Sequence, residues 1–368
     1  MPTTKTTSAM PSRHPALIRA QHFAQHLGLR MPVAHAPMAG VPAVGLAAAV
    51  SHAGGLAALG ALLMDPAAIA DWVARYRALA PGPLQINLWV PDPPPRRDAA
   101  HEAFVRAFLG HWGPPVAADA ADAPLQDFAA QCQALLVARP RVVSSIMGLL
   151  PPDEVRRLKA AGIDWWATVT TVAEARAAQA AGADAVVAQG SEAGGHRGAF
   201  VAASARDSAV GLFALLPQVV DAVKVPVVAT GGIADARGVA AALLLGASAV
   251  QVGTALLRCP EAALSPAWSQ ALAGAAPEDT RLTRAFSGRW GRALATDYVH
   301  AAAAAGAPEP APYPVQRGLT AAMRKHAEQA GDVQRMQAWA GQGAGLATAQ
   351  PAQAWLQAVW SQAQELLG

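Results

Sequence analysis

The feature that most constrains the fold is a repeated alternation of short apolar runs with segments of helical periodicity, which occupies residues 32–253. Each apolar run has the length of a strand, and glycines or polar residues separate it from the segments on either side. Strands that alternate with helices through short turns pair in parallel, with right-handed crossovers. We expect strands at 32–36, 56–59, 84–90, 142–145, 164–169, 184–188, 225–229 and 249–253.

Eight such units close naturally into a (β/α)8 barrel, so we predict an α/β fold of the TIM-barrel type. The expected helices lie at 15–27, 43–52, 66–77, 128–137, 152–161, 172–181, 212–223 and 235–245. An open doubly wound sheet is the alternative. We prefer the barrel because polar residues or glycines stand at the C-terminal end of most strands, and a barrel gathers these ends at one mouth.

Two segments do not follow the alternation. Residues 91–124 are too long for an ordinary connection between a strand and a helix, and residues 263–350 are expected to be mostly helical with irregular connections. We expect both to build a smaller domain over the C-terminal mouth, called the lid below. The barrel domain then comprises residues 15–90 and 125–262, the helix at 351–368 docks back on it, and residues 1–14 form a disordered tail.

Composition excludes several classes of protein. Hydrophobic residues make up 53% and charged residues 14%, which suits strands buried on both faces. The net charge of +3 comes without a run of basic residues, so no nucleic-acid partner is expected. No apolar stretch reaches the ~20 residues of a membrane-spanning helix, and the first residues do not resemble a signal peptide. Two distant cysteines, Cys132 and Cys259, indicate neither disulfides nor a metal site, and a cytoplasmic location is expected.

The chemistry is predicted to centre on the loop at 189–198, QGSEAGGHRG, which follows the sixth expected strand. Its glycines allow backbone N–H groups to approach a ligand closely, and His196 is the side chain most easily poised for proton transfer near neutral pH. A glycine-rich turn alone is also compatible with simple chain geometry. The position of this loop among the other strand ends favours a functional interpretation.

Two further glycine turns, at 229–235 and 251–255, follow the seventh and eighth expected strands. Loops at this point of a barrel commonly bind phosphate through backbone N–H groups and a short helix N-terminus. A single phosphate with an aromatic ring across the mouth indicates a mononucleotide. We expect FMN and not a dinucleotide, because no GxGxxG turn with a distal acidic residue is present.

Other residues at strand ends then become candidate ligands of this cofactor. Met38 could lie beside the ring, Asn87 and Gln189 offer amide groups, and Thr168 offers a hydroxyl, although each could equally be a capped turn or a packed side chain. The full set of expected cofactor-binding residues is Met38, Asn87, Thr168, Gln189, Gly194, Gly195, Gly231, Gly232, Gln251, Gly253 and Thr254.

The motifs APMAG at 36–40, QGSEAGGHRG at 189–198, GGIAD at 231–235 and QVGTA at 251–255 together resemble the FMN-dependent nitronate monooxygenases, formerly called 2-nitropropane dioxygenases. The resemblance extends into the tail, where YPVQ at 313–316 and WAGQ at 339–342 stand in the order expected of class I of that family. It therefore covers nearly the whole chain.

This resemblance implies oxidative denitrification of alkyl nitronates, such as propionate 3-nitronate, in which O2 is consumed and a carbonyl product and nitrite leave. His196 would be catalytic, either positioning the anion or taking the α-proton of a neutral nitroalkane, with a pKa near the ordinary 6.5. The expected partners are a small nitronate and O2, and the expected assembly is a monomer or homodimer.

Two alternatives remain open from the sequence, and a third is disfavoured. An FMN-dependent enoyl-[acyl carrier protein] reductase that uses NAD(P)H would share the EAGGH and GGIAD motifs. A flavin-binding module without turnover is compatible with the unusual composition of residues 91–124. A barrel similar to inosine monophosphate dehydrogenase would need a nucleophilic cysteine on a mouth loop, and Cys132 and Cys259 are poorly placed for that role.

Overall fold

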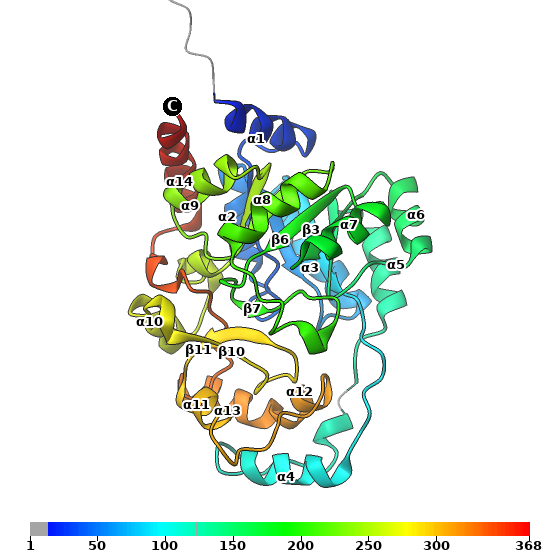
Figure 1. Cartoon of the computed structure of the whole chain (residues 1–368), viewed down its shortest axis with the longest axis vertical. Helices are drawn as coiled ribbons and strands as arrows, with labels where there is room; N and C mark the ends of the chain where they lie inside the picture. The colour runs from blue at the N-terminus through cyan, green and yellow to red at the C-terminus, as the bar shows by residue number, and fades with distance from the viewer. Residues whose placement is uncertain (1–13, 123) are drawn as a thin grey trace, which may run out of the picture.

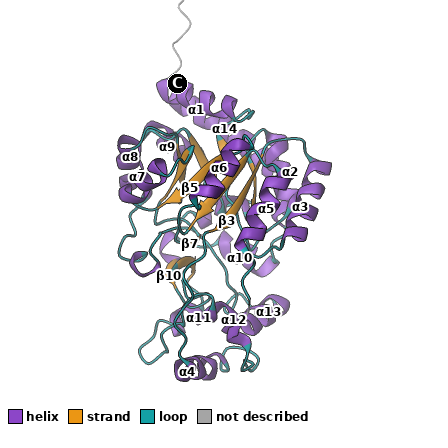
Figure 2. Cartoon of the chain, turned by 90° about the vertical axis from the view of Figure 1, so that its right-hand side faces the viewer, coloured by secondary structure: helices purple, strands orange, loops and turns teal. Residues whose placement is uncertain are grey.

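The computed structural model describes residues 14–122 and 124–368, so the tail expected at 1–14 lies outside the described residues except for His14. The molecule has two parts, a barrel surrounded by helices and a smaller part at one end that contains α4 and α11 to α13, while α10 lies beside the barrel and packs on its core (Figure 1). The second view shows the strands of the barrel gathered in the larger part and α4 farthest from it (Figure 2).

The predicted barrel is confirmed. Its strands are β1 (Val33–His35), β2 (Ala57–Gly60), β3 (Leu84–Trp89), β4 (Val142–Ile146), β5 (Asp164–Val169), β6 (Ala185–Gln189), β8 (Val227–Thr230) and β9 (Ala249–Val252). All neighbours pair in parallel, in the order β1-β9-β8-β6-β5-β4-β3-β2. The N–H of His35 donates to the carbonyl of Leu56 at 2.8 Å, and the N–H of Leu56 donates to that of Val33, which closes the ring between β1 and β2.

The barrel helices begin where the sequence offers capping residues. At the start of α3, the carboxylate of Asp65 accepts a hydrogen bond from the N–H of Ala68 at 2.8 Å, and Pro66 occupies the first turn. The helices are α1 (Pro15–His26), α2 (Val44–Ala53), α3 (Pro66–Leu79), α5 (Phe128–Ala138), α6 (Pro152–Ala160), α7 (Val172–Ala180), α8 (Leu212–Ala222) and α9 (Ala236–Leu244).

The position of an eighth outer helix is taken by the end of the chain. Between β9 and α10 the chain forms two short turns of 3-10 helix, η3 (Thr254–Leu256) and η4 (Pro260–Ala262), in place of an outer helix. The last helix, α14 (Ala352–Leu367), packs against α9 and α2 and buries Trp355 and Leu356 in the main core. Residues more than 100 positions apart therefore complete one layer of the barrel.

Side chains alternate along each strand between two environments. Those that point outward, such as Val186 and Ile86, pack against the helices in the main hydrophobic core. Those that point inward form a second apolar cluster that includes Val142, Trp166 and Val187. Nearer the C-terminal ends the inward residues become polar, and this polar layer consists of Gln85, Asn87, Ser144, Thr168, Gln189, Thr230 and Gln251.

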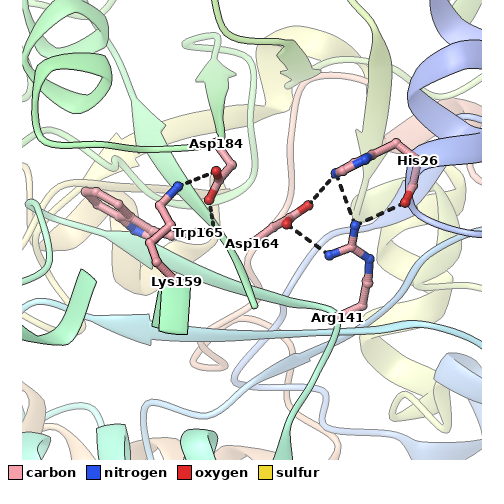
Figure 3. A network of polar contacts seen from close by, with 6 residues as sticks. All are labelled: His26, Arg141, Lys159, Asp164, Trp165 and Asp184. Carbon is pink, nitrogen blue, oxygen red and sulfur yellow. Dashed lines mark hydrogen bonds and ion pairs between the residues drawn. The ribbon is translucent and has the colours of Figure 1, made fainter. Parts of the chain in front are cut away.

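The opposite end of the barrel is fixed by ion pairs (Figure 3). Asp164, the first residue of β5, pairs with Arg141 at 2.9 Å and contacts His26 of α1 at the same distance. Arg141 also donates to the backbone carbonyl of His26. Close by, Asp184 pairs with Lys159 and accepts a hydrogen bond from the N–H of Trp165. These contacts join α1 and the strand starts, which in a barrel serve stability.

The lid contains a hydrophobic cluster of its own, in which Val105 and Leu109 of α4 pack with Phe286, Tyr298 and Leu319. The helices of residues 91–124 and 263–350 are α4 (Ala99–Leu109), α10 (Pro266–Ala273), α11 (Asp297–Ala301), α12 (Val315–Leu319) and α13 (Ala321–Ala330). The same segments contain short 3-10 turns: η1 (Ala120–Asp122) after α4, η5 (Pro277–Asp279) after α10 and η6 (Ala344–Leu346) after α13. A further one, η2 (Ala202–Ser204), lies in the connection to α8.

The expectation that residues 263–350 are mostly helical with irregular connections missed a small sheet. Strands β10 (Thr280–Thr283) and β11 (Gly291–Leu294) pair antiparallel, and β11 also pairs with β7 (Gly195–His196) of the glycine loop. The sheet escaped prediction because each strand is only a few residues long, and because β7 lies far from its partner β11 in the sequence. Among the described residues, no helix is long and apolar enough to cross a membrane.

Candidate active site

A cavity of about 290 Å³ opens at the C-terminal mouth of the barrel, beneath residues of the lid. All twelve residues predicted to be catalytic or to bind the cofactor line this single cavity: Met38, Asn87, Thr168, Gln189, Gly194, Gly195, His196, Gly231, Gly232, Gln251, Gly253 and Thr254. Its volume is close to that of ordinary small-molecule sites. The structure thus brings together predicted residues from six of the eight strand ends, those of β1, β3, β5, β6, β8 and β9.

The glycine loop at 189–198 is held in shape by its own first residue. The amide of Gln189 donates to the carbonyl of His196 at 3.1 Å and accepts from the N–H of Gly198 at 2.8 Å. The side chain predicted to contact a cofactor therefore uses both ends of its amide within the loop. Its clearest effect is to place His196.

Two buried arginines hold the same loop from behind by its carbonyl groups. Arg197 donates to the carbonyl of Gly190 at 2.6 Å, and Arg292 of β11 donates to that of Ser191 at 2.8 Å. Burial lowers the pKa of Arg197 to about 10, with the charge of Arg292 acting in the same direction. Because the arginines occupy these carbonyl groups from behind, the loop has little freedom to move.

Glu192, within the glycine loop, bonds to the start of α8 and not to His196. Its carboxylate accepts hydrogen bonds from the N–H of Leu212 at 2.8 and 3.0 Å, at the start of α8. A carboxylate at a helix N-terminus satisfies unpaired N–H groups and the helix dipole. Glu192 therefore anchors the loop to α8.

The glycine turns meet so closely that side chains would not fit between them. A Cβ atom on Gly194 would lie 2.5 Å from the nitrogen of Gly341, and one on Gly343 would lie 3.0 Å from the carbonyl oxygen of Gly232. The N–H of Gly341 donates to the hydroxyl of Thr254 at 3.0 Å. The tail motif at 339–342 therefore forms part of the cavity wall.

Backbone donors remain free at the turns after β8 and β9. Within the described part of the chain, the N–H groups of Gly232, Thr254 and Ala255 donate to no protein acceptor. All three residues line the cavity. Free N–H groups on converging glycine turns form a site suited to an anion such as phosphate.

His196 stands between two tryptophan rings. Its ring centroid is 4.7 Å from that of Trp89 and 4.7 Å from that of Trp339, each in an edge-on arrangement. Its Nε2 atom is 2.6 Å from the hydroxyl of Ser287, which also accepts from the N–H of Arg289. Among the described residues no partner bonds Nδ1, so this nitrogen remains available to a ligand.

The expectation of a pKa near 6.5 for His196 is wrong. Burial, together with the positive charges of Arg289, Arg317 and Arg324, lowers the pKa of His196 to about 3. The ring borders the cavity, yet the surrounding protein removes it from bulk water. The imidazole is therefore neutral at physiological pH and acts through hydrogen bonds in the free protein.

Two arginines give the cavity a positive charge. Arg317 and Arg324 line its wall, and in the described part of the chain neither pairs with an acidic side chain. Arg324 donates to the side-chain oxygen of Gln337 at 3.0 Å and to the carbonyl of Arg317 at 2.9 Å. Burial lowers the pKa of Arg324 to about 10, which leaves it charged. Among the residues that the structure describes, the guanidinium of Arg317 bonds no acceptor, so the cavity favours an anionic ligand.

The floor of the cavity is formed by the polar layer of the barrel. Ser144 accepts hydrogen bonds at its hydroxyl from the amides of Gln85, at 2.8 Å, and Asn87, at 3.0 Å. The nitrogen of Gln85 is also 3.4 Å from the side-chain oxygen of Gln251. The side-chain carbonyl oxygen of Gln85 is buried and has no hydrogen-bond partner among the described residues.

Sequence reasoning missed several residues that complete the cavity. They are Gln85, Trp89, Ser144, Ser287, Tyr313, Arg317, Arg324 and Trp339. Tyr313 and Trp339 stand in the tail motifs, which could have marked them as part of the site. Gln85 and Ser144 lie on the inward face of their strands, which the alternation of side chains could have indicated. For Ser287, Arg317 and Arg324 no local pattern distinguishes them from ordinary lid residues.

Comparisons with known proteins agree with this arrangement. A family model described as nitronate monooxygenase matches residues 21–359. A nitronate monooxygenase of Pseudomonas aeruginosa is 40% identical over 335 residues, covering 90% of this chain and 95% of that protein. A nitroalkane oxidase from Streptomyces ansochromogenes superposes with a TM-score of 0.85 at 36% identity, covering 94% of this chain and 100% of the other. FabK from Thermotoga maritima gives a TM-score of 0.73 at 27% identity, covering 94% and 96%.

Proposed function

Because the chain belongs to the nitronate monooxygenase family, we propose that it binds FMN in the mouth cavity and oxidises alkyl nitronates with O2 to a carbonyl product and nitrite. The observation that carries this proposal is one cavity that contains a neutral His196, the phosphate-type glycine turns, and two arginines that form no ion pair with an acidic side chain of the described residues.

The residues present fit a phosphate at one end of the cavity. Gly232, Thr254 and Ala255 offer N–H groups that no protein atom accepts, in the part of the chain that is described. The hydroxyl of Thr254 accepts a bond from Gly341, and its own proton is free to be donated. These groups would hold the FMN phosphate.

The residues also fit a flavin ring. Met38, Thr168 and Asn87 line the cavity around the polar floor. A Cβ atom built on Gly195 would have no other atom within 4 Å, so there is open space next to this glycine. The redox chemistry, the passage of electrons from the nitronate to O2, is what FMN supplies when bound. The protein contributes geometry and charge.

His196 is proposed to hold the reacting group. Since Ser287 occupies Nε2, Nδ1 is the nitrogen that can bond an oxygen of the nitronate. A group whose pKa is about 3 is a weak base, so it is poorly suited to remove the α-proton of a neutral nitroalkane. We therefore propose the anionic nitronate, and not the neutral nitroalkane, as the form consumed.

Arg317 and Arg324 are proposed to balance the charge of the substrate. A nitronate with a second anionic group, such as propionate 3-nitronate, carries two negative charges, and the cavity offers two guanidinium groups that lack acidic partners. Charge-assisted hydrogen bonds of this kind are stronger than those between neutral groups. The substrate class is therefore a small, anionic nitronate.

An anaerobic titration tests this function. Addition of propionate 3-nitronate to the FMN-loaded protein is expected to change the flavin absorbance, and readmission of O2 should release nitrite. Absence of any flavin response to several nitronates, together with rapid bleaching by NAD(P)H, would contradict the proposal and support an enoyl reductase instead.

Three further expectations stay predictions. They are a cytoplasmic location, a monomeric or homodimeric assembly, and the division of the chain into a barrel (15–90 and 125–262) and a lid (91–124 and 263–350). Sedimentation of the purified protein and limited proteolysis would test the assembly and the division.

A further inference from the structure

We propose that the side-chain carbonyl of Gln85 binds the isoalloxazine ring of the cofactor by accepting a hydrogen bond from its N–H at position 3. This inference rests on the proposed FMN site. It adds to the predicted ligands a residue that lies two positions before Asn87 on the same strand.

Gln85 lies inside the barrel. It is the second residue of β3, its side chain is 1% exposed, and it lines the cavity together with Asn87. Residues two apart on a strand point to the same side, so both amides face the interior. Gln85 is therefore the deeper of two amide groups on one face of the same strand.

The orientation of its amide is fixed by its neighbours. The Nε2 atom donates to the hydroxyl of Ser144 at 2.8 Å and lies 3.4 Å from the side-chain oxygen of Gln251. A carbonyl oxygen in place of this nitrogen would repel the oxygen of Gln251. The amide nitrogen of Gln85 therefore faces Ser144 and Gln251, and its carbonyl oxygen points away from them.

This oxygen has no partner in the described part of the chain, although it is buried. A buried acceptor without a donor is costly, and proteins rarely keep one unless something outside the chain satisfies it. Because Gln85 lines the cavity, a bound molecule can supply the missing donor. An acceptor placed here selects a ligand that carries an N–H or O–H group.

FMN offers two kinds of hydrogen-bond donor to such an acceptor, a ring N–H group and hydroxyl groups. The oxidised ring carries one N–H, at position 3, and the ribityl chain carries hydroxyl groups. The free N–H groups suited to the phosphate lie on the turns after β8 and β9. Gln85 lies on β3, in the polar floor of the barrel interior. Since β3 stands apart from those strands in the barrel order, we assign the ring N–H to Gln85.

The test compares two flavins on two proteins. Full-length protein freed of flavin is titrated with FMN and with 3-methyl-FMN, which lacks the ring N–H, and binding is followed by quenching of flavin fluorescence. Gln85→Met keeps the length of the side chain and removes the acceptor. We expect this variant to bind FMN about five- to tenfold more weakly than the wild-type protein does. Its affinity for 3-methyl-FMN should equal or exceed that of the wild-type protein for the same flavin.

Gln131→Met is a matched control. Gln131 is 4% exposed, its amide donates to the carbonyls of Ala61 and Met64, and it lies outside this cavity. Its substitution should leave the ratio of the two flavin affinities at the wild-type value. A loss of affinity in Gln85→Met that is equal for both flavins would overturn the inference, because a ribityl contact or a purely structural role would act on both alike.

The same titrations distinguish a failure of the inference about Gln85 from a failure of the proposed FMN site. Binding of FMN by wild type with no loss in Gln85→Met would overturn the role of Gln85 and leave the FMN site standing. Failure of the wild-type protein to bind FMN at all would overturn both.

Discussion

At the scale of single residues, His196 is set apart by its neutral imidazole and its bond to Ser287. We expect His196→Asn to retain FMN and to lower turnover of nitronates by about 100-fold, since a hydrogen bond to the reacting group is lost or misplaced. Steady-state nitrite release and FMN titration measure the two effects. Undiminished turnover in the variant would sink the assignment.

The low pKa of His196 also predicts the pH profile. Because its pKa is about 3, the ring stays neutral throughout the range from pH 5 to 9, and kcat/KM for a nitronate should show no inflection near 6.5 from this residue. An inflection near 6.5 that disappears in His196→Asn would show that the free enzyme holds an ordinary imidazole.

Arg317 is expected to select among nitronates. Arg317→Gln should raise KM for propionate 3-nitronate about tenfold or more, with a smaller effect on ethylnitronate, which lacks the second charge. Lys325→Gln is the control, because Lys325 is an exposed cation on α13 that does not line the cavity. Equal effects of Arg317→Gln on both substrates would rule out a specific contact with the second anion.

The sequence predicts part of this site and not the rest, for a physical reason. Glycines and His196 stand in short local motifs whose chemistry is independent of distant contacts. Ser287 and Trp89 act only because the fold brings them to His196. The same holds for the pKa of His196, since the three arginines that depress it come from separate parts of the lid.

At the scale of elements, the close contact of the glycine turns should make them intolerant of side chains. Gly194→Ala places a Cβ 2.5 Å from the nitrogen of Gly341, so we expect a loss of about 1–3 kcal/mol in stability and weaker FMN binding. Gly274→Ala, where no atom lies within 4 Å, should be nearly neutral. Thermal melts and flavin titration distinguish them, and equal behaviour of the two variants would refute the packing argument.

The eight barrel strands could be predicted because each is a local apolar run between turn residues. Strands β10 and β11 were not predicted, because each is only four residues long and the pairing of β11 with the distant β7 forms only in the folded protein. The glycine loop itself was predicted as a loop, yet Gly195 and His196 become a strand through contact with β11. Pairing between distant segments thus overrides local preference.

At the scale of the whole molecule, acid should destabilise the fold. Burial lowers the pKa of His35, which is 2% exposed, from 6.5 to about 4. The unfolded chain takes up a proton near pH 6.5 that the native state refuses, so stability is full above 6.5 and is lost as the pH falls from 6.5 towards 4. His35→Leu should flatten the dependence of Tm on pH over this window. An unchanged slope in the variant would exclude His35 as its source.

The packing of α14 between α9 and α2 has a consequence for synthesis of the protein. The helix that completes the outer layer is made more than 100 residues after α9, so the helices on either side of it, together with the strands they cover, leave the ribosome with an exposed apolar face. The barrel can close its wall only after α14 has been synthesised. A nonsense codon near position 350 should therefore yield an aggregating product, even though every residue of the predicted site would have been translated.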